Sequence, residues 1–461
     1  MRGSIDRLTG LDQLMVRASA LWPQEIGALA VLDGANLLEP TGRFRVEAVR
    51  EAIESRLPLV PRFRQVVHVP RWGLGGPLWV DAPAFDVRDH VRVLALADAG
   101  GEAELLLATE RRRRQPLDPA RPLWEMWFLT GLPDGRIALF VKLHHAIADG
   151  MAAMATVAAF LDTIPDAPTA PARPWTPAPP PSAGALLADN LLRHVERLGR
   201  ALAVLARPRT TVGRLRAAWP ATRELVAEAP APETSLNRMV GPGRNLALIR
   251  TTLGQVKDVA HAHRATVNDV LLAVTAGGLR ELLDSRGEPV EDTVVRVYVP
   301  VSLRARAPGP QQGNRIAQMA APLALGVPDP GRRLRQIAAE TARRKARART
   351  SLGTLFGGRI VRRLLLKAVV RQRVNVTTAS IPGPEVPLYL AGARVFEVFP
   401  VLPLIANEPL GVGALSYAGT FAIGVVADQD ACPDIDVFTA AMRDDLHALG
   451  VATPIAEGVR S

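Results

Sequence analysis

The chain has little of several residue types, and each shortage excludes a class of protein. Only one of its 461 residues is cysteine, Cys432, so no disulfide can form within the chain, and a reducing compartment is expected. Aromatic residues make up 5% of the sequence, too few to favour a surface that stacks RNA bases. No apolar run reaches the ~18 residues that a membrane span needs, and the first residues hold no apolar signal core. These shortages predict a cytoplasmic protein, or one that is peripheral on a membrane.

The basic charge comes almost entirely from arginine. Lysine and arginine together number 56 against 45 acidic residues, for a net charge of +11, and lysine occurs only at Lys142, Lys257, Lys345 and Lys367. Such an arginine bias is typical of a GC-rich bacterial coding sequence, which accounts for part of the charge. Because the charge is spread along the chain without helix-turn-helix or zinc-finger spacing, no nucleic-acid partner is expected. An anionic membrane surface or an acidic ligand stays open.

Several catalytic motifs are also missing from the sequence. It has no G-x-S-x-G nucleophile elbow, no H-E-x-x-H and no cluster of cysteine and histidine. What it does contain is the motif HHxxxDG, formed by His144, His145, Asp149 and Gly150. The apolar run 137–143 just before it predicts a buried strand, and the spacing predicts a helix over 150–161.

This motif is equipped to move a proton. A neutral imidazole accepts a proton near pH 7, and a histidine general base contributes about 10²–10⁴-fold to a rate. Adjacent side chains on a strand face opposite ways, so His144 and His145 are not expected to bind one metal ion. One should face a cavity, and the other should take part in packing or a structural hydrogen bond. The spacing does not decide which, and a purely structural pair is the alternative.

A proline-rich stretch over 165–182 divides the chain, because proline at this density favours an extended tether. We expect an N-terminal subdomain over 1–164, a linker over 165–235 and a C-terminal subdomain over 236–461. The linker also holds a predicted basic amphipathic helix over 187–205. Its apolar face suits either a protein core or a membrane or lipid-droplet surface.

Helical and strand patterns mix on both sides of the linker, which predicts an α/β (α+β) fold. Further helices are predicted over residues 46–57, 103–114, 267–283, 332–345 and 435–449. Further strands are predicted over residues 294–301, 374–379 and 421–427.

The sequence QPLDPARPLWE at 115–125, followed by a strand and HHxxxDG, resembles the bacterial wax ester synthase/acyl-CoA:diacylglycerol acyltransferase family. The resemblance covers essentially the whole chain. Further matching blocks are Pro61-Arg62-Phe63-Arg64, Phe85-Asp86 with His90, Ser235-Leu236-Asn237, residues 266–273, residues 299–302 with Arg304, Gly313-Asn314, residues 415–417 with Gly419, and Asp428 with Pro433-Asp434.

The resemblance implies two chloramphenicol-acetyltransferase-like subdomains with a substrate tunnel between them that carries HHxxxDG. It implies that His145 is the general base, that His144 supports the site, and that Asp149 is mainly structural beside Gly150. The second-half residues expected to contact substrate are Asn268, Asp269, Ser302, Arg304 and Ser380. For Asn268 and Asp269 the alternative is helix capping, in which asparagine would serve as the N-cap.

One block departs from the family pattern. The family usually has Ser-Asn-x-Pro-Gly-Pro where this chain has Ala379-Ser380-Ile381-Pro382-Gly383-Pro384. Ser380 replaces an amide that could bond backbone or substrate, which bears on acceptor choice and rate.

The expected function is transfer of a long-chain acyl group from acyl-CoA, a co-substrate, to diacylglycerol or a fatty alcohol, without a metal or other cofactor. We expect the protein to lie peripherally on the inner face of the cell membrane or on lipid inclusions. Basic clusters over 343–349, 359–367 and 111–114 could meet CoA phosphates or anionic headgroups, or could be solvated helix faces. The alternatives are an HHxxxDG acyltransferase with another hydroxyl acceptor or a carrier-bound donor, and a non-catalytic lipid-binding protein.

Overall fold

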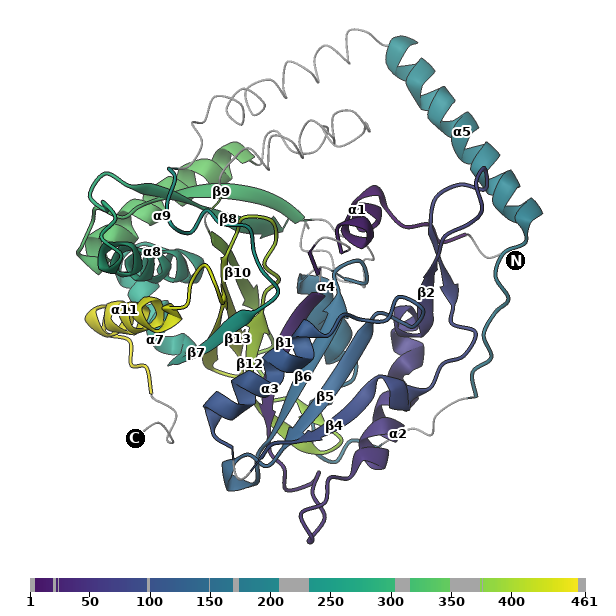
Figure 1. Ribbon diagram of the computed structural model, residues 1–461, viewed down its shortest axis with the longest axis horizontal. Coiled ribbons are helices and arrows are strands. Elements are labelled where there is room, and N and C mark those ends of the chain that lie inside the picture. The colour runs from purple at the N-terminus through teal and green to yellow at the C-terminus, as the bar shows by residue number, and fades with distance from the viewer. Residues whose placement is uncertain are drawn as a thin grey trace.

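Two six-stranded sheets organise the chain (Figure 1). The structure is a computed structural model. It describes residues 5–19, 22–23, 25–97, 100–148, 150–168, 174–206, 232–302, 316–348, 374 and 376–454. A short hairpin of β2 (Gln65–His68) and β3 (Leu78–Asp81) forms a further small sheet.

The first sheet has the order β11-β12-β1-β6-β5-β4. Its strands are β1 (Glu25–Leu32), β4 (Val91–Ala95), β5 (Trp124–Thr130), β6 (Ile137–His144), β11 (Tyr389–Leu390) and β12 (Ala393–Val401). All eight residues of β6 are buried, as expected for an apolar run in a central strand. The helices of this half are α1 (Gly10–Ala18), α2 (Val46–Arg56), α3 (Glu102–Arg114) and α4 (Gly150–Ala158).

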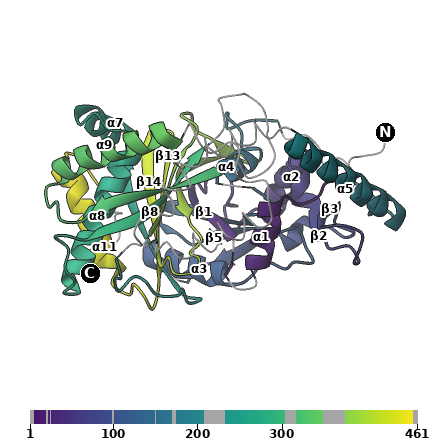
Figure 2. The ribbon, with the colours of Figure 1, turned by 90° about the horizontal axis from the view of Figure 1, so that it is seen from above.

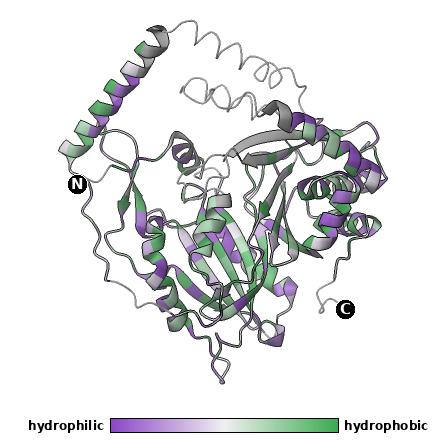
Figure 3. Ribbon diagram, turned by 180° about the vertical axis from the view of Figure 1, so that it is seen from behind, coloured by the Kyte–Doolittle hydropathy of each residue, from purple (hydrophilic) through white to green (hydrophobic). Residues whose placement is uncertain are grey.

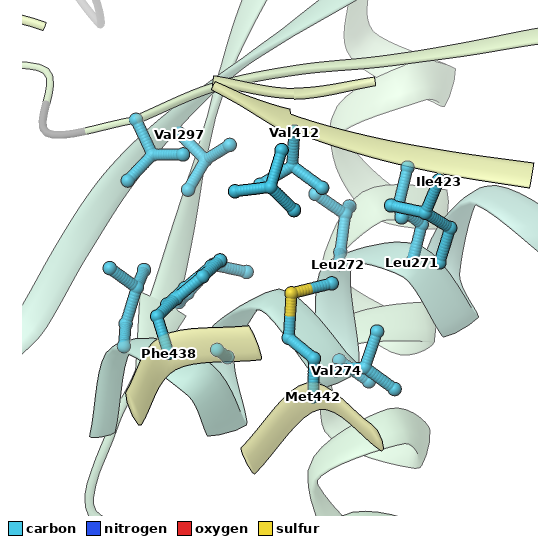
Figure 4. Packing of buried hydrophobic residues seen from close by; sticks show 14 of the residues in the cluster. Leu271, Leu272, Val274, Val297, Val412, Ile423, Phe438 and Met442 are labelled. Carbon is cyan, nitrogen blue, oxygen red and sulfur yellow. The ribbon is translucent and has the colours of Figure 1, made fainter. Parts of the chain in front are cut away.

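The second sheet has the order β7-β14-β13-β10-β8-β9. Its strands are β7 (Arg244–Thr252), β8 (Val294–Ser302), β9 (Ile316–Ala324), β10 (Val376–Pro382), β13 (Leu410–Tyr417) and β14 (Thr420–Asp428). Its helices are α7 (Leu253–Ala262), α8 (Val267–Ser285), α9 (Pro330–Ala348) and α11 (Ile435–Ala448). Figure 4 shows Phe438 and Met442 of α11 beside Leu272 and Val274 of α8, beneath strand residues such as Val412. Thirteen residues of α8 are buried, so this helix is the centre of the C-terminal core.

The two sheets do not divide the chain at the predicted linker. β12 lies in the second half of the chain but pairs with β1 of the first half, in the register Gly27↔Val401. It also crosses the second sheet so closely that a Cβ on Gly424 would lie 2.2 Å from the carbonyl oxygen of Pro400. Segments 1–164 and 236–461 therefore do not each hold one complete sheet.

Three of the sequence blocks named above meet in one aromatic stack. The Trp124 ring stacks on Phe63 at 4.7 Å and on His90 at 4.5 Å between ring centroids. Trp124 Nε1 donates a hydrogen bond to Phe63 O at 2.9 Å, and Phe85 stacks on the other side of His90. The three blocks therefore pack together in the apolar core of the first half.

The described part of the linker is attached to the first half rather than free. Trp175 packs edge-on against Phe85 and lies 5.0 Å from the Arg64 guanidinium. The backbone N–H of Ala178 donates to Asp81. After this linker segment, helix α5 (Ala183–Ala206) runs along the edge of the molecule (Figures 1 and 2).

Candidate active site at the end of strand β6

The two histidines of HHxxxDG stand where β6 ends. His144 is the last residue of β6 and pairs with Glu25 of β1, and its backbone N–H donates to Leu123 O at 2.9 Å. His145 belongs to the turn that follows, in which Ile147 N–H donates to His144 O. Only His144 is thus a strand residue. The side chains of His144 and His145 therefore differ in direction because the chain turns between them, as well as because neighbouring strand residues alternate.

Both ring nitrogens of His144 are used in structural hydrogen bonds. The backbone N–H of Ala146 donates to His144 Nδ1 at 3.0 Å. Because a backbone N–H can only donate, Nδ1 is an acceptor and the ring proton of the neutral form sits on Nε2. Nε2 lies 2.6 Å from Ser19 Oγ, and this hydroxyl in turn donates to Met15 O. The bonds fix the tautomer of His144.

Burial keeps His144 neutral. The residue is 5% exposed, and desolvation, with a smaller effect of charge on His145, lowers its pKa from 6.5 to about 4. A group that is neutral near pH 7 and engaged at both nitrogens is suited to supporting the site.

His145 has a different environment. Its Nδ1 atom is buried, but the residue as a whole is partly exposed, unlike His144. Part of this residue therefore reaches the surface, whereas His144 is buried. Asp149 lies outside the described residues, and Gly150 is the first residue of α4.

Strands of the C-terminal half add side chains to the apolar core that also holds residues of this turn. Leu415 and Tyr417 of β13 belong to the same buried apolar cluster as Ala148, and Ile381 of β10 packs against that cluster together with Ile147. The carboxyl ends of β10 and β13 therefore contribute to the same apolar core as the turn after His145.

Ser380 lies where the second sheet opens. β10 pairs with β13 as far as Pro382, but it pairs with the parallel strand β8 only at Val376 and Thr377. One residue further along β10, a side-chain hydrogen bond joins the two strands, from Thr378 Oγ1 to Tyr298 O at 3.1 Å. Beyond it, half-buried Ser380 lies on the part of β10 that has no ladder to β8.

Of the two other predicted substrate contacts, one lies at the same end of the sheet. Ser302 ends β8, on the far side of the opening from Ser380, and pairs with Ile316 of β9. Its side chain is not among those described, and Arg304 lies outside the described residues.

Asp269 has a structural role at the start of α8. Its Oδ2 accepts bonds from the backbone N–H and hydroxyl of Thr266, which caps the helix, and its Oδ1 accepts a bond from Thr341 of α9. The N-cap is therefore Thr266 and not Asn268, while Asp269 completes the capping box, so the capping alternative applies to Asp269. The neighbouring Asn268 is half-buried, and its Nδ2 has no hydrogen-bond partner among the described residues.

Several described arginines of the basic clusters have partners within the fold. Arg343 and Arg344 both pair with Glu340 of α9, and Arg113 of α3 pairs with Glu110. The guanidinium of Arg112 lies over the Trp127 ring. The side chains of 345–348, and residues 349 and 359–367, lie outside the description.

The predicted tunnel stays a prediction. Two cavities outlined by described residues have volumes of about 210 and 370 Å³, and neither is lined by His144 or His145. Within the described part of the chain, no three His, Cys, Asp or Glu side chains group as metal ligands would.

Sequence reasoning missed Ser19 and the pair Thr378 and Tyr298. Ser19 is 125 positions from His144 in the chain, and no local spacing marks a lone serine as its partner.

Sequence comparisons assign the family. Residues 8–271 match the family described as the wax ester synthase/diacylglycerol acyltransferase catalytic domain, and residues 312–450 match the WS/DGAT C-terminal domain. A probable diacylglycerol O-acyltransferase of Mycobacterium tuberculosis is 32% identical over 92% of this chain and 90% of its own length. A second one from that species is 31% identical over 92% of this chain and 95% of its own length.

Solved structures agree on the fold. The wax ester synthase/diacylglycerol acyltransferase of Marinobacter aquaeolei has a TM-score of 0.68 at 24% identity, covering 96% of this chain and 98% of that one. The starter condensation domain of the rhizomide synthetase has a TM-score of 0.61 at 17% identity, covering 99% and 97%. The expected two-subdomain α/β architecture is confirmed.

The fold, together with the match of residues 8–271 to an acyltransferase catalytic domain, defines an acyltransferase of the two-subdomain class. Within that class, the chain belongs to the wax ester synthase/diacylglycerol acyltransferase family, whose members are acyl-CoA-dependent O-acyltransferases.

Proposed function

We propose that this chain transfers a long-chain acyl group from acyl-CoA to the hydroxyl of diacylglycerol, a fatty alcohol or both, with His145 as general base. The observation that carries the assignment is the division between the two histidines. His144 is buried, neutral and bonded at both ring nitrogens, so His145 is the residue of the pair suited to exchange a proton.

The proposed reaction balances without a metal or another cofactor. His145 removes the hydroxyl proton of the acceptor while its oxygen attacks the thioester carbonyl. The tetrahedral intermediate collapses, the carbon–sulfur bond breaks, and the proton on His145 passes to the leaving CoA sulfur. Hydrogen-bond donors that face the intermediate's oxyanion stabilise it.

Among the predicted substrate contacts, Ser380 is the best supported, because it is half-buried on the opened part of β10, next to Ile381, which packs against the core that also holds Ala148. Ser302, at the matching end of β8, is the second. We also propose that Arg304 and Asn268 contact the substrate. Asp269 is disfavoured because both of its carboxylate oxygens are engaged within the fold.

The acceptors of this reaction dissolve in lipid, so we also propose peripheral association with the cell membrane or lipid inclusions. No described helix is both long and apolar enough to cross a bilayer. Association would thus use a surface of the protein.

One assay tests the function. Purified protein is given labelled palmitoyl-CoA with diacylglycerol or hexadecanol, and ester formation and CoA release are both measured. His145→Ala should lower kcat/KM by about 10²–10⁴-fold, with an unchanged circular dichroism spectrum. His68→Ala, which removes an exposed histidine of β2, is the matched control and should keep full activity.

Two outcomes would contradict the proposal. Activity retained by a folded His145→Ala protein would remove His145 as the base. No ester from either acceptor with the unaltered protein, and CoA release at background, would favour the non-catalytic lipid-binding alternative.

A further inference from the structure

Helix α5 turns its apolar side to solvent. Leu187, Leu191, Leu192, Val195, Leu198 and Leu202 are each 56–64% exposed. At 3.6 residues per turn, all of them except Leu192 fall within about 80° of one another around the helix. We call these five residues the α5 stripe. A surface helix normally buries such a stripe against the protein core. In α5 the stripe faces solvent instead.

The opposite side of α5 attaches the helix to the protein. Leu186 is buried at 3% exposure. Asp189 accepts a hydrogen bond from Arg7 Nε at 2.6 Å, Asn190 Nδ2 donates to Gly73 O at 2.9 Å, and Arg193 donates to Ile5 O. These contacts hold the polar side inward and direct the α5 stripe away from the molecule (Figure 3).

An exposed tryptophan lies on the loop that α5 contacts. Trp72 is fully exposed and Val69 is 70% exposed, and both belong to the β2–β3 loop that holds Gly73. Tryptophan favours the boundary between water and lipid, because its ring is apolar and its N–H is polar. The loop also carries the exposed Arg71.

We propose that the α5 stripe and Trp72 form one docking surface for an anionic phospholipid bilayer. The exposed Arg71 next to Trp72, and the net charge of +11, suit a negatively charged surface. The helix would lie in the plane of the headgroups. The inference rests on the proposed function in one respect, namely that the bilayer supplies the acceptor.

The docking surface is also linked to the histidine pair. Ile5 and Arg7, which hold α5, precede α1, and Ser19 directly after α1 contacts His144. A path of 12 residues, mostly helical, spans about 20 Å. Docking through α5 would therefore hold the HHxxxDG turn near the lipid from which an acceptor arrives.

Flotation with vesicles of phosphatidylcholine and phosphatidylglycerol tests the surface. The triple variant Leu191→Gln, Val195→Gln, Leu198→Gln should partition onto vesicles about tenfold less than the unaltered protein, because three apolar side chains no longer enter the interface. Trp72→Ala should partition about threefold less. Leu107→Gln is the matched control, because it makes the same change at a leucine of α3 that is 55% exposed, and its binding should not change.

The outcomes separate this proposal from the catalytic one. Vesicle binding by the triple variant equal to that of the unaltered protein would overturn the proposal. A second result would also overturn it: the unaltered protein does not bind vesicles but forms a dimer, and the triple variant is monomeric. The occupant of the α5 stripe would then be a second copy of this chain. Vesicle binding lost in the triple variant would support the surface even if no acyl transfer were found, so the two proposals fail independently. Activity on a short-chain acyl-CoA and a water-soluble alcohol should not differ between the triple variant and the unaltered protein.

Discussion

At the scale of single residues, environment separates two identical neighbours. His144 ends a buried strand, where Ser19 and the Ala146 N–H occupy its ring nitrogens. His145 stands one residue later in a turn and stays partly exposed. The same side chain is therefore a structural group at one position and the proposed base at the next.

The lowered pKa of His144 predicts a pH dependence of stability. Above pH 6.5 the ring is neutral in both folded and unfolded chains, so its contribution is complete. As the pH falls from 6.5 to about 4, the unfolded chain binds a proton that the folded chain does not. This difference should lower the free energy of unfolding by up to about 3 kcal/mol.

A comparison with His144→Gln isolates this effect. Burial raises the pKa of Glu408 to about 7 and that of Asp445 to about 6. These carboxyls act with the opposite sign over nearly the same pH range, since the folded chain holds their protons more tightly. The stability difference between the unaltered protein and His144→Gln, from urea unfolding at pH 7 and pH 4.5, should therefore shrink at the lower pH. A difference that does not depend on pH would show that His144 is not held neutral.

At the scale of elements, the start of α8 joins two helices. Asp269 completes a capping box with Thr266 and binds Thr341, so one carboxylate orders the first turn of α8 and ties it to α9. A carboxylate near a helix N-terminus is also favoured by the helix dipole. These two structural roles explain why an aspartate stands at position 269 without any contact between Asp269 and substrate.

Asp269→Ala should lower the free energy of unfolding by about 2 kcal/mol, because the cap and the bond from Thr341 are both lost. Its KM for acyl-CoA should not change. Asn268→Ala is the paired variant and should cost less than about 1 kcal/mol, because its amide nitrogen makes no hydrogen bond that the described residues show. Urea unfolding and steady-state kinetics on both variants check this. A large rise in KM with normal stability for Asp269→Ala would assign it to substrate binding instead.

At the scale of the whole molecule, the two halves are built into each other. β12 completes the first sheet, and Arg250 of β7 pairs with Glu102 of α3 at 2.6 Å and with Glu397 of β12 at 3.1 Å. Leu390 and Val395 fill the apolar core of the first half. We expect the full chain to unfold as one cooperative unit.

Residues 1–235 expressed alone should fail to fold. The fragment would expose the edge of β1, which pairs with β12 in the whole chain, and would lack the core residues that β11–β13 provide. Size-exclusion chromatography and circular dichroism should show aggregation or a non-cooperative chain, and co-expression with residues 236–461 should recover a complex. A monomeric fragment with a sharp thermal transition would contradict this expectation.

Much of the local structure was predictable because it depends on neighbours in the chain. The helices expected over 46–57, 103–114, 267–283, 332–345 and 435–449 are confirmed within a few residues. The strand before HHxxxDG is confirmed, because eight consecutive residues buried on both faces leave an unbroken apolar run. Strands such as β1, β7 and β12 were not predicted, since their burial depends on partners far along the chain.

The sequence by itself determined the family, the strand that carries HHxxxDG and the amphipathic character of residues 187–205, because residue type and spacing encode them directly. Only the tertiary structure decided that His144 is the buried histidine, that β12 belongs to the first sheet, and that the apolar side of α5 faces outward. These outcomes depend on which distant surfaces meet, such as Ser19 with His144 or Arg7 with Asp189. Contacts of that kind leave no local pattern in the chain.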